Sequence, residues 1–141
     1  EDGSVMTVFR YKEQHQSYPG RVHGGMITAM LDEMGLRSLW AKELSEETFG
    51  VTISLDTKYR KPVPYETELI GRGVVVKNTS HFIITDSYIM DKDGEILANG
   101  RIKYIKMDTQ KIQEGVEVHE EMPYLVEDGR TEIEGPFFDN L

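Results

Sequence analysis

The sequence predicts an α+β domain in which one long helix packs against a mainly antiparallel sheet. Three observations support this class. Residues 24–44 are rich in Met, Leu and Ala and contain no proline, which is typical of a long helix. Four segments with the composition of strands follow, separated by short turns. One strand-like segment precedes the helix, so the order is strand, helix and four strands.

The elements before the sheet follow from local composition. Residues 5–11 are apolar and rich in β-formers, so we expect a strand. Residues 13–21 contain Ser17, Pro19 and Gly20, and we expect a loop there. The helix should begin at residue 24 and end near residue 44.

The four later strands are separated by recognisable turns. Residues 51–60 alternate, which predicts one face with Val51, Ile53, Leu55 and Tyr59 and another with Thr52, Ser54, Asp56, Lys58 and Arg60. Pro62 and Pro64 end this strand. Further strands are expected at 68–77, 81–90 and 95–107. Residues 78–80 and 91–94 form the turns between them, and Gly94 suits the second.

The helix is apolar around most of its circumference. At 100° per residue, three methionines lie on one side and three other apolar residues lie nearly opposite, namely Met26, Met30 and Met34 against Ala29, Leu36 and Leu39. Such a helix should be largely buried. Because one sheet covers only one side of a helix, the sheet must wrap around it or a second subunit must contribute.

Composition restricts the class of protein. The chain has 141 residues, 38% hydrophobic and 29% charged, which fits one domain with a substantial core. The absence of cysteine removes disulfides, thiolate nucleophiles and cysteine-based zinc sites, and fits a reducing compartment, so we expect a cytoplasmic protein. No segment is apolar enough for a membrane span. The sequence begins at Glu1 rather than Met, which leaves room for a removed targeting segment.

The net charge of −9 is concentrated at one end. Residues 108–141 carry ten acids and two bases, whereas residues 1–107 are nearly neutral with fifteen acids and fourteen bases. We therefore divide the chain into a domain at 1–107 and an acidic C-terminal extension at 108–141. Its charge disfavours a nucleic-acid partner. The extension is either solvated or packs on another subunit through its few apolar residues.

Two adjacent carboxylates interrupt the helix. Glu33 lies four residues before Arg37, which is the favourable order for a helical ion pair, so Glu33 is interpreted as structural. Asp32 has no such partner, and aspartate is a poor residue in mid-helix. It requires a partner from elsewhere, a solvent boundary or a functional role. A carboxylate in a shielded cleft can act as a general base or nucleophile.

Two glycines mark the start of the helix. Gly24 and Gly25 form either a simple loop-to-helix turn or a place where a ligand approaches the backbone closely. The first amides of a helix are free donors at its positive end and can stabilise an oxyanion. Gly24 lies about 12 Å along the axis from Asp32. In an antiparallel pair of such helices, Gly24 of one copy would approach Asp32 of the other, so the spacing favours a site shared between two subunits.

The segment around this helix resembles a known family. It reads YPGRVHGGMITAMLDEMG, which is similar to the signature of the hotdog-fold acyl-CoA thioesterases of the phenylacetyl-CoA and hydroxybenzoyl-CoA type: His-Gly-Gly, a spacer, then an acidic residue on the central helix. Residues 51–105 resemble the rest of that domain, with its strand ending in Pro-Val and its Asp-Gly turn. The resemblance covers about residues 5–107.

The resemblance implies a fold and a reaction. The fold would be a hotdog: a curved antiparallel sheet wrapped around one long central helix, forming a homodimer or a dimer of dimers. The reaction would be hydrolysis of an acyl-CoA thioester, with no cofactor beyond the coenzyme A of the substrate. Asp32 stands where the family keeps its base or nucleophile, Gly24 where an amide binds the carbonyl, and Thr52 where some members carry an orienting hydroxyl.

Further site residues follow from the resemblance or from charge. His23 and Gly25 would shape the start of the helix. Several members carry Asn or Gln about six residues before the His; Ser17 stands there here, next to Gln16, and His15 is close by. Lys58, Arg60 and Lys61 are either a solvated strand face or partners for the phosphates of coenzyme A.

Three other functions were weighed. The four histidines lack helical metal spacing, so we expect no metal site. A hotdog hydratase would need an Asp/His pair, and His23 lies nine residues before Asp32 at the far end of the helix. A non-catalytic module that binds acyl-CoA as a sensor or carrier is the main alternative, because Ser17 departs from the family pattern.

Overall fold

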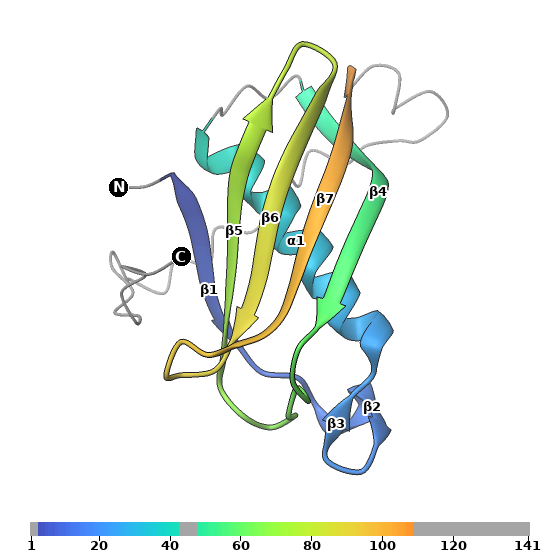
Figure 1. Ribbon diagram of the computed structural model, residues 1–141, viewed down its shortest axis with the longest axis vertical. Helices are drawn as coiled ribbons and strands as arrows, with labels where there is room; N and C mark the ends of the chain where they lie inside the picture. Colours follow the sequence, from blue (N-terminus) through green and yellow to red (C-terminus); the bar gives the residue numbers. More distant parts are fainter. Residues whose placement is uncertain (1–2, 43–47, 109–141) are drawn as a thin grey trace, which may run out of the picture.

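The computed structural model describes residues 3–42 and 48–108 and shows a curved antiparallel sheet packed on one long helix (Figure 1). The sheet contains β1 (Ser4–Phe9), β4 (Thr48–Tyr59), β5 (Leu69–Asn78), β6 (Phe82–Met90) and β7 (Ile96–Asp108). Their order is β1-β5-β6-β7-β4, and every neighbouring pair is antiparallel. Helix α1 (Gly24–Lys42) lies against the inner face of the sheet. The predicted α+β layout is confirmed.

The segment at 13–21 is more ordered than predicted. The short helix η1 (Glu13–His15) is followed by β2 (Gln16–Tyr18) and β3 (Arg21–Val22), which pair as a small antiparallel hairpin. Gly20 adopts φ of 77° at its turn, which glycine does at little cost. The prediction of a plain loop was wrong because strands of two or three residues are too short to show a hydrophobic period.

The boundaries of the long elements differ modestly from the prediction. Helix α1 ends at Lys42, and residues 43–44 lie outside the described part of the chain. Strand β4 begins three residues earlier than expected. Gly50, which we expected to lie before the strand, is part of it. A Cβ at Gly50 would lie 3.0 Å from Leu39 Cδ1, so the glycine admits the helix side chain.

The predicted alternation of β4 does not hold through its first residues, Val51 and Thr52. The pairing of β4 with β7 shifts register between Thr52 and Ser54, which marks a β-bulge. Thr52 therefore pairs with Tyr104 on the inner face, where its side chain reaches the helix, although the period had placed it with Asp56 on the other face. Because the bulge adds one residue, the side chains before it lie on the opposite faces from those that the later alternation predicts.

Glycines in β5 let the helix approach the sheet. A Cβ at Gly73 would lie 2.0 Å from the backbone oxygen of Met34, and a Cβ at Gly71 would lie 3.1 Å from the Met34 sulfur. No other residue type fits at Gly73 without moving the helix. The contact fixes the depth at which α1 lies in the curve of the sheet.

The sheet covers only one side of α1. Ile27, Leu31, Met34 and Ser38 are buried, and Leu31 joins the core cluster with Leu69 and Ile89. On the other side Met26 is 37% exposed and Ala29 is exposed. The expectation of a largely buried helix is therefore not met within one chain. No helix among the described residues is long and apolar enough to cross a membrane.

Candidate active site

Asp32 is held by two hydroxyl groups from the sheet. Thr52 on edge strand β4 donates from Oγ1 to Asp32 Oδ1 at 3.0 Å, and its distance to Oδ2 is 3.2 Å. Tyr104 on β7 lies with its hydroxyl 3.1 Å from Oδ1 and 2.8 Å from the backbone oxygen of Asp32. The aspartate is half-buried. The partners that Asp32 lacks on its own helix are thus supplied by two strands of the sheet, and the carboxylate stays partly exposed.

Sequence reasoning missed Tyr104. Burial first, and then the negative charge of Asp32, raises the pKa of the Tyr104 hydroxyl. The group therefore keeps its proton and serves as a donor. In the sequence, a tyrosine within a predicted strand looks like any other core residue. Only the β4–β7 register places Tyr104 beside Thr52 and under the helix.

Glu33 behaves as predicted. It forms an ion pair with Arg37 one turn along α1. Both side chains are partly exposed, so the pair contributes little to stability. The two adjacent carboxylates therefore differ in surroundings, because only Asp32 is directed toward hydroxyl groups of the sheet.

His23 caps the start of α1. Its backbone oxygen accepts hydrogen bonds from the amides of Met26 and Ile27, and its ring Nδ1 accepts one from the amide of Gly25 at 2.9 Å. The Gly25 amide is thus already used. Within the described residues the amide of Gly24 has no partner, and it lies at the positive end of the helix. Of the two glycines, Gly24 is therefore the one whose amide can donate a hydrogen bond to a ligand.

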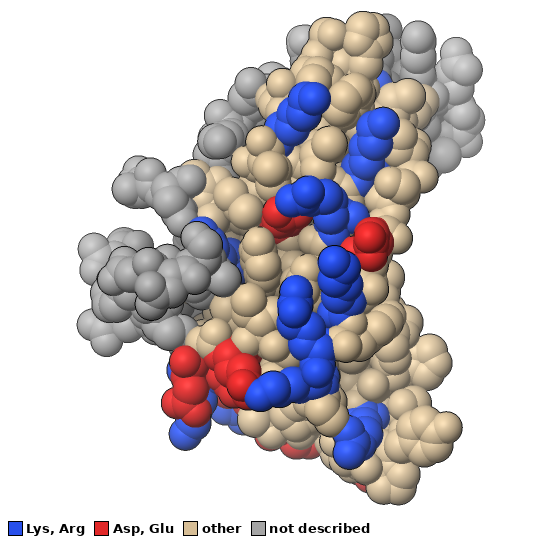
Figure 2. Space-filling view, in the orientation of Figure 1, with Lys and Arg blue, Asp and Glu red and all other residues tan. Residues whose placement is uncertain are grey.

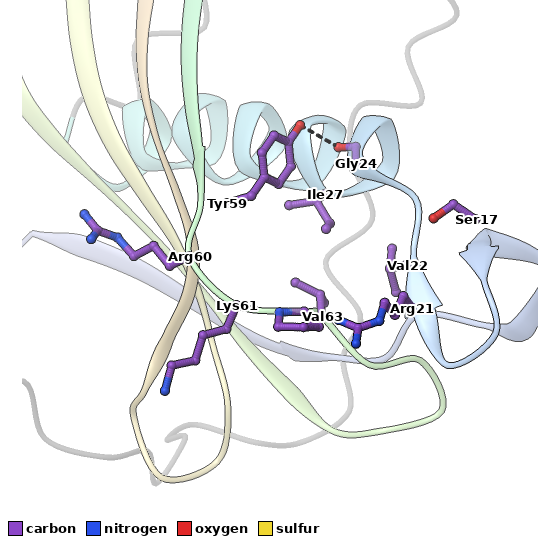
Figure 3. A pocket seen from close by; sticks show the side chains of 10 residues that line it. Ser17, Arg21, Val22, Gly24, Ile27, Tyr59, Arg60, Lys61 and Val63 are labelled. Carbon is purple, nitrogen blue, oxygen red and sulfur yellow. Dashed lines mark hydrogen bonds between the residues drawn. The ribbon is translucent and has the colours of Figure 1, made fainter.

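A cleft of about 420 Å³ opens at this helix start (Figure 3). Gly24 and Ile27 line it from α1, Ser17 and Val22 from the hairpin, and Val63 from the segment after β4. Arg21, Arg60 and Lys61 also line it. The cleft thus combines an apolar wall, a free backbone amide and cationic side chains.

Tyr59 connects β4 to the helix start and was also missed by sequence reasoning. Its hydroxyl donates to the backbone oxygen of Gly24 at 3.1 Å (Figure 3). The same hydroxyl lies 2.7 Å from Thr28 Oγ1. A Cβ at Gly24 would lie 3.3 Å from the same hydroxyl oxygen. The residue therefore holds the glycine backbone close against the end of β4.

The predicted basic cluster is divided between two faces. Lys58 lies on the outer face of the sheet, in a second pocket with Asp56 and Arg101, and Figure 2 shows Lys and Arg side chains gathered on that face. Lys61 lines the cleft and forms an ion pair with Glu95. Arg60 borders both places, and its Nε donates to Asn99.

His15 does not line the cleft at the helix start. Its ring packs edge-on against Tyr11, and its Nδ1 accepts a hydrogen bond from the Lys12 amide. Its backbone oxygen accepts the His23 amide and so supports the helix start. Within residues 3–42 and 48–108 no group of three or more acidic residues or histidines is placed to hold a metal ion.

The predicted residues therefore form two groups within one chain. Ser17, Gly24, Arg60 and Lys61 meet at the cleft, and Asp32 lies with Thr52 farther along α1. The eight residues between Gly24 and Asp32 correspond to about 12 Å of helix. No single acyl group in one chain touches both the free amide and the carboxylate.

Comparison with known proteins decides the family. The model of the thioesterase superfamily matches residues 19–98, which include the helix, the cleft and most of the sheet. The chain belongs to the thioesterase superfamily. The resemblance inferred from the His-Gly-Gly segment is confirmed, and the curved sheet around one helix is the hotdog fold of this superfamily.

Individual superfamily members show how far the likeness extends. Human acyl-coenzyme A thioesterase 13 is 23% identical over 100 residues, which are 70% of each chain. A solved thioesterase superfamily protein is 27% identical with a TM-score of 0.66, over 73% of this chain but only 51% of that longer one. A thioesterase protein solved with coenzyme A from Streptococcus pneumoniae is 20% identical with a TM-score of 0.67, over 76% of this chain and 80% of that one.

Proposed function

We propose that this superfamily member hydrolyses an acyl-CoA thioester at sites formed between two copies of the chain. Each site would combine the Gly24 amide of one copy with the Asp32 carboxylate of the other. The free amide of Gly24, a residue that lines the cleft, carries this proposal. Superfamily membership supports the reaction class.

The chemistry follows from these two groups. The Gly24 amide, at the positive end of α1, would donate to the thioester carbonyl oxygen and stabilise the oxyanion that forms on attack. Asp32 would either take a proton from the attacking water or attack the carbonyl itself. In both cases the acyl–sulfur bond breaks and coenzyme A leaves as the thiol, with one water consumed. Thr52 would orient the carboxylate through the bond it already makes.

Edge strand β4 supports the pairing of two copies. It pairs only with β7, so the other side of its backbone is unpaired within the described chain. Its apolar side chains Val51 and Ile53 are exposed, Ile53 by 52%. A long open edge with exposed apolar residues favours strand pairing with a second chain. Such a pairing would also cover the exposed Met26 side of α1.

The position of Thr28 supports the antiparallel alignment. It is the midpoint between Gly24 and Asp32, and it lies against β4 through its contacts with Thr57 and Tyr59. A two-fold axis near this point would place Gly24 of each copy against Asp32 of the other. Two equivalent sites would result.

The cations of the cleft suit the substrate. Coenzyme A carries phosphates, and Arg binds phosphate through paired donors. Arg21 and Arg60 lie at the cleft where an acyl-CoA would enter with its acyl end toward the helix. Lys58 lies on the outer face and is not expected to contribute.

Thiol release from a panel of acyl-CoAs tests the reaction. Wild-type protein should release coenzyme A from at least one acyl-CoA, and Asp32→Asn should lose release while still binding the substrate. Release that survives the substitution would remove Asp32 from the mechanism. Clear binding without release by the wild type would support the non-catalytic acyl-CoA module instead.

Mixing two inactive variants tests the sharing of sites. Asp32→Asn and Gly24→Pro chains, unfolded together and refolded, would form hybrid dimers in which one site regains both groups. A random mixture should recover about one quarter of the wild-type activity. If both groups act within one chain, no hybrid is active and the mixture stays as inactive as its parts.

A further inference from the structure

Tyr104 combines full burial with a contact to the candidate catalytic carboxylate. Its side chain is 0% exposed, and its hydroxyl lies 3.1 Å from Asp32 Oδ1 and 2.8 Å from the Asp32 backbone oxygen. The single hydroxyl hydrogen of the phenol is shared between these two acceptors and so ties the carboxylate to the helix backbone. Because the side chain is fully buried, a bound substrate would not touch it.

A glycine on α1 leaves space for the Tyr104 hydroxyl group. A Cβ at Gly35 would lie 2.5 Å from the Tyr104 hydroxyl oxygen and 2.5 Å from Thr85 Oγ1. Gly35 therefore leaves the space under α1 that the phenol occupies. Thr85 and Ser87 line the same space and are both fully buried. Three hydroxyl groups thus meet under one glycine between the helix and the sheet.

We propose that Tyr104 is a positioning residue for the reaction, acting through Asp32. This role rests on the proposed function: Tyr104 fixes the rotamer of the Asp32 carboxylate and stabilises its charged form. Gly35 makes the contact possible. Tyr104 would not touch the substrate, and Thr52, its register partner on β4, supplies the second donor.

The charges near Asp32 are few among the described residues. On α1 the neighbouring Glu33 is paired with Arg37. From β4 and β7 the groups that contact Asp32 are the hydroxyls of Thr52 and Tyr104, neither of which is charged at neutral pH. The two hydroxyl donors are therefore the groups most directly able to favour the ionised carboxylate.

The matched variants Tyr104→Phe and Tyr11→Phe test the proposal. Tyr11 is also buried, and its hydroxyl donates to a helix carbonyl, that of Met26, at 3.2 Å. Both substitutions remove a buried phenol bond to α1, but only one touches Asp32. Tyr104→Phe should lower kcat about tenfold with KM little changed, and shift the acidic limb of the pH–rate profile to higher pH. Tyr11→Phe should leave both unchanged.

Titration of Asp32 by nuclear magnetic resonance separates the two proposals. With carboxyl-labelled aspartate, the titration midpoint of Asp32 should move to higher pH in Tyr104→Phe and stay in place in Tyr11→Phe. This readout needs no activity, so it tests the positioning even if the wild type releases no thiol. An unchanged midpoint, or equal losses of kcat in both variants, would overturn the role of Tyr104.

Gly35→Ala provides a second variant that keeps the hydroxyl. Its methyl group would displace the phenol from Asp32, so the same shift of the Asp32 midpoint is expected, provided that the circular dichroism spectrum remains that of the wild type. If Tyr104→Phe fails to fold, this variant decides the question. A folded Gly35→Ala protein with an unmoved midpoint would contradict the proposal.

Discussion

Replacing Gly24 by proline should remove the proposed oxyanion donor while keeping the helix. Gly24 is the first residue of α1, after the cap formed by His23. Proline is well tolerated at this position because its fixed φ suits the helix and its missing amide hydrogen had no helical partner. The substitution therefore removes the one hydrogen that the proposed mechanism uses.

Gly24→Ala is the matched control for this experiment. Both substitutions place a Cβ 3.3 Å from the Tyr59 hydroxyl oxygen, so alanine matches proline in that contact. Only proline loses the amide hydrogen. Loss of one oxyanion donor costs about 3 kcal/mol, or roughly a hundredfold to a thousandfold in kcat. The ratio of the alanine to the proline variant should show that factor.

Thiol release is a clean assay for this chain. The protein contains no cysteine, so a chromogenic disulfide reports only the coenzyme A that is released. The variants should bind the acyl-CoA with similar affinity and unfold at similar temperatures. Equal kcat values for Gly24→Ala and Gly24→Pro, at equal stability, would show that the Gly24 amide has no part in the reaction.

Three further predictions concern the fold and its pairing. Gly73→Ala should destabilise the fold by about 3 kcal/mol or more in urea unfolding, because its Cβ would meet the Met34 backbone, whereas Gly100→Ala, at ordinary contact distances, should be tolerated. Burial raises the pKa of the Tyr11 hydroxyl above its ordinary value of 10.0. The free energy of unfolding that this neutral hydroxyl contributes is therefore fully present below pH 10.0 and falls as the pH rises above it. Tyr11→Phe should reduce this alkaline loss of melting temperature. If copies pair through β4 as proposed, Ile53→Lys should give a smaller species than the wild type in light scattering, with about 0.5 kcal/mol or less effect on folding. An oligomer of unchanged size would argue against pairing through β4.

Most long elements of this fold were predictable because their signals are local. The helix at 24–42 has its composition, its glycine start and its length in one segment, and the later strands are separated by turn residues. The short hairpin of β2 and β3 was missed because two- and three-residue strands carry no period. The reversal of faces in β4 was missed because a bulge is defined by the partner strand, and β7 lies about fifty residues away.

Some residues of the candidate site could likewise be predicted from their local sequence, and others could not. Asp32 was identified because an unpaired aspartate in an apolar helix is locally costly, and Gly24 because it precedes the helix. Tyr59 and Tyr104 were not identified, since an aromatic residue in a strand is ordinary core material. Lys58 and Arg60 looked alike in sequence, yet the sheet directs Lys58 to its outer face and leaves Arg60 beside the cleft.

The sequence by itself determined the class of fold, the start of the helix and the identity of the carboxylate that needed a partner. Each of these depends on neighbours within a few residues along the chain. Only the tertiary structure decided which partners that carboxylate has and which glycine amide is free. Thr52 and Tyr104 reach Asp32 through strand register and helix depth, and both are set by contacts between residues far apart in the sequence.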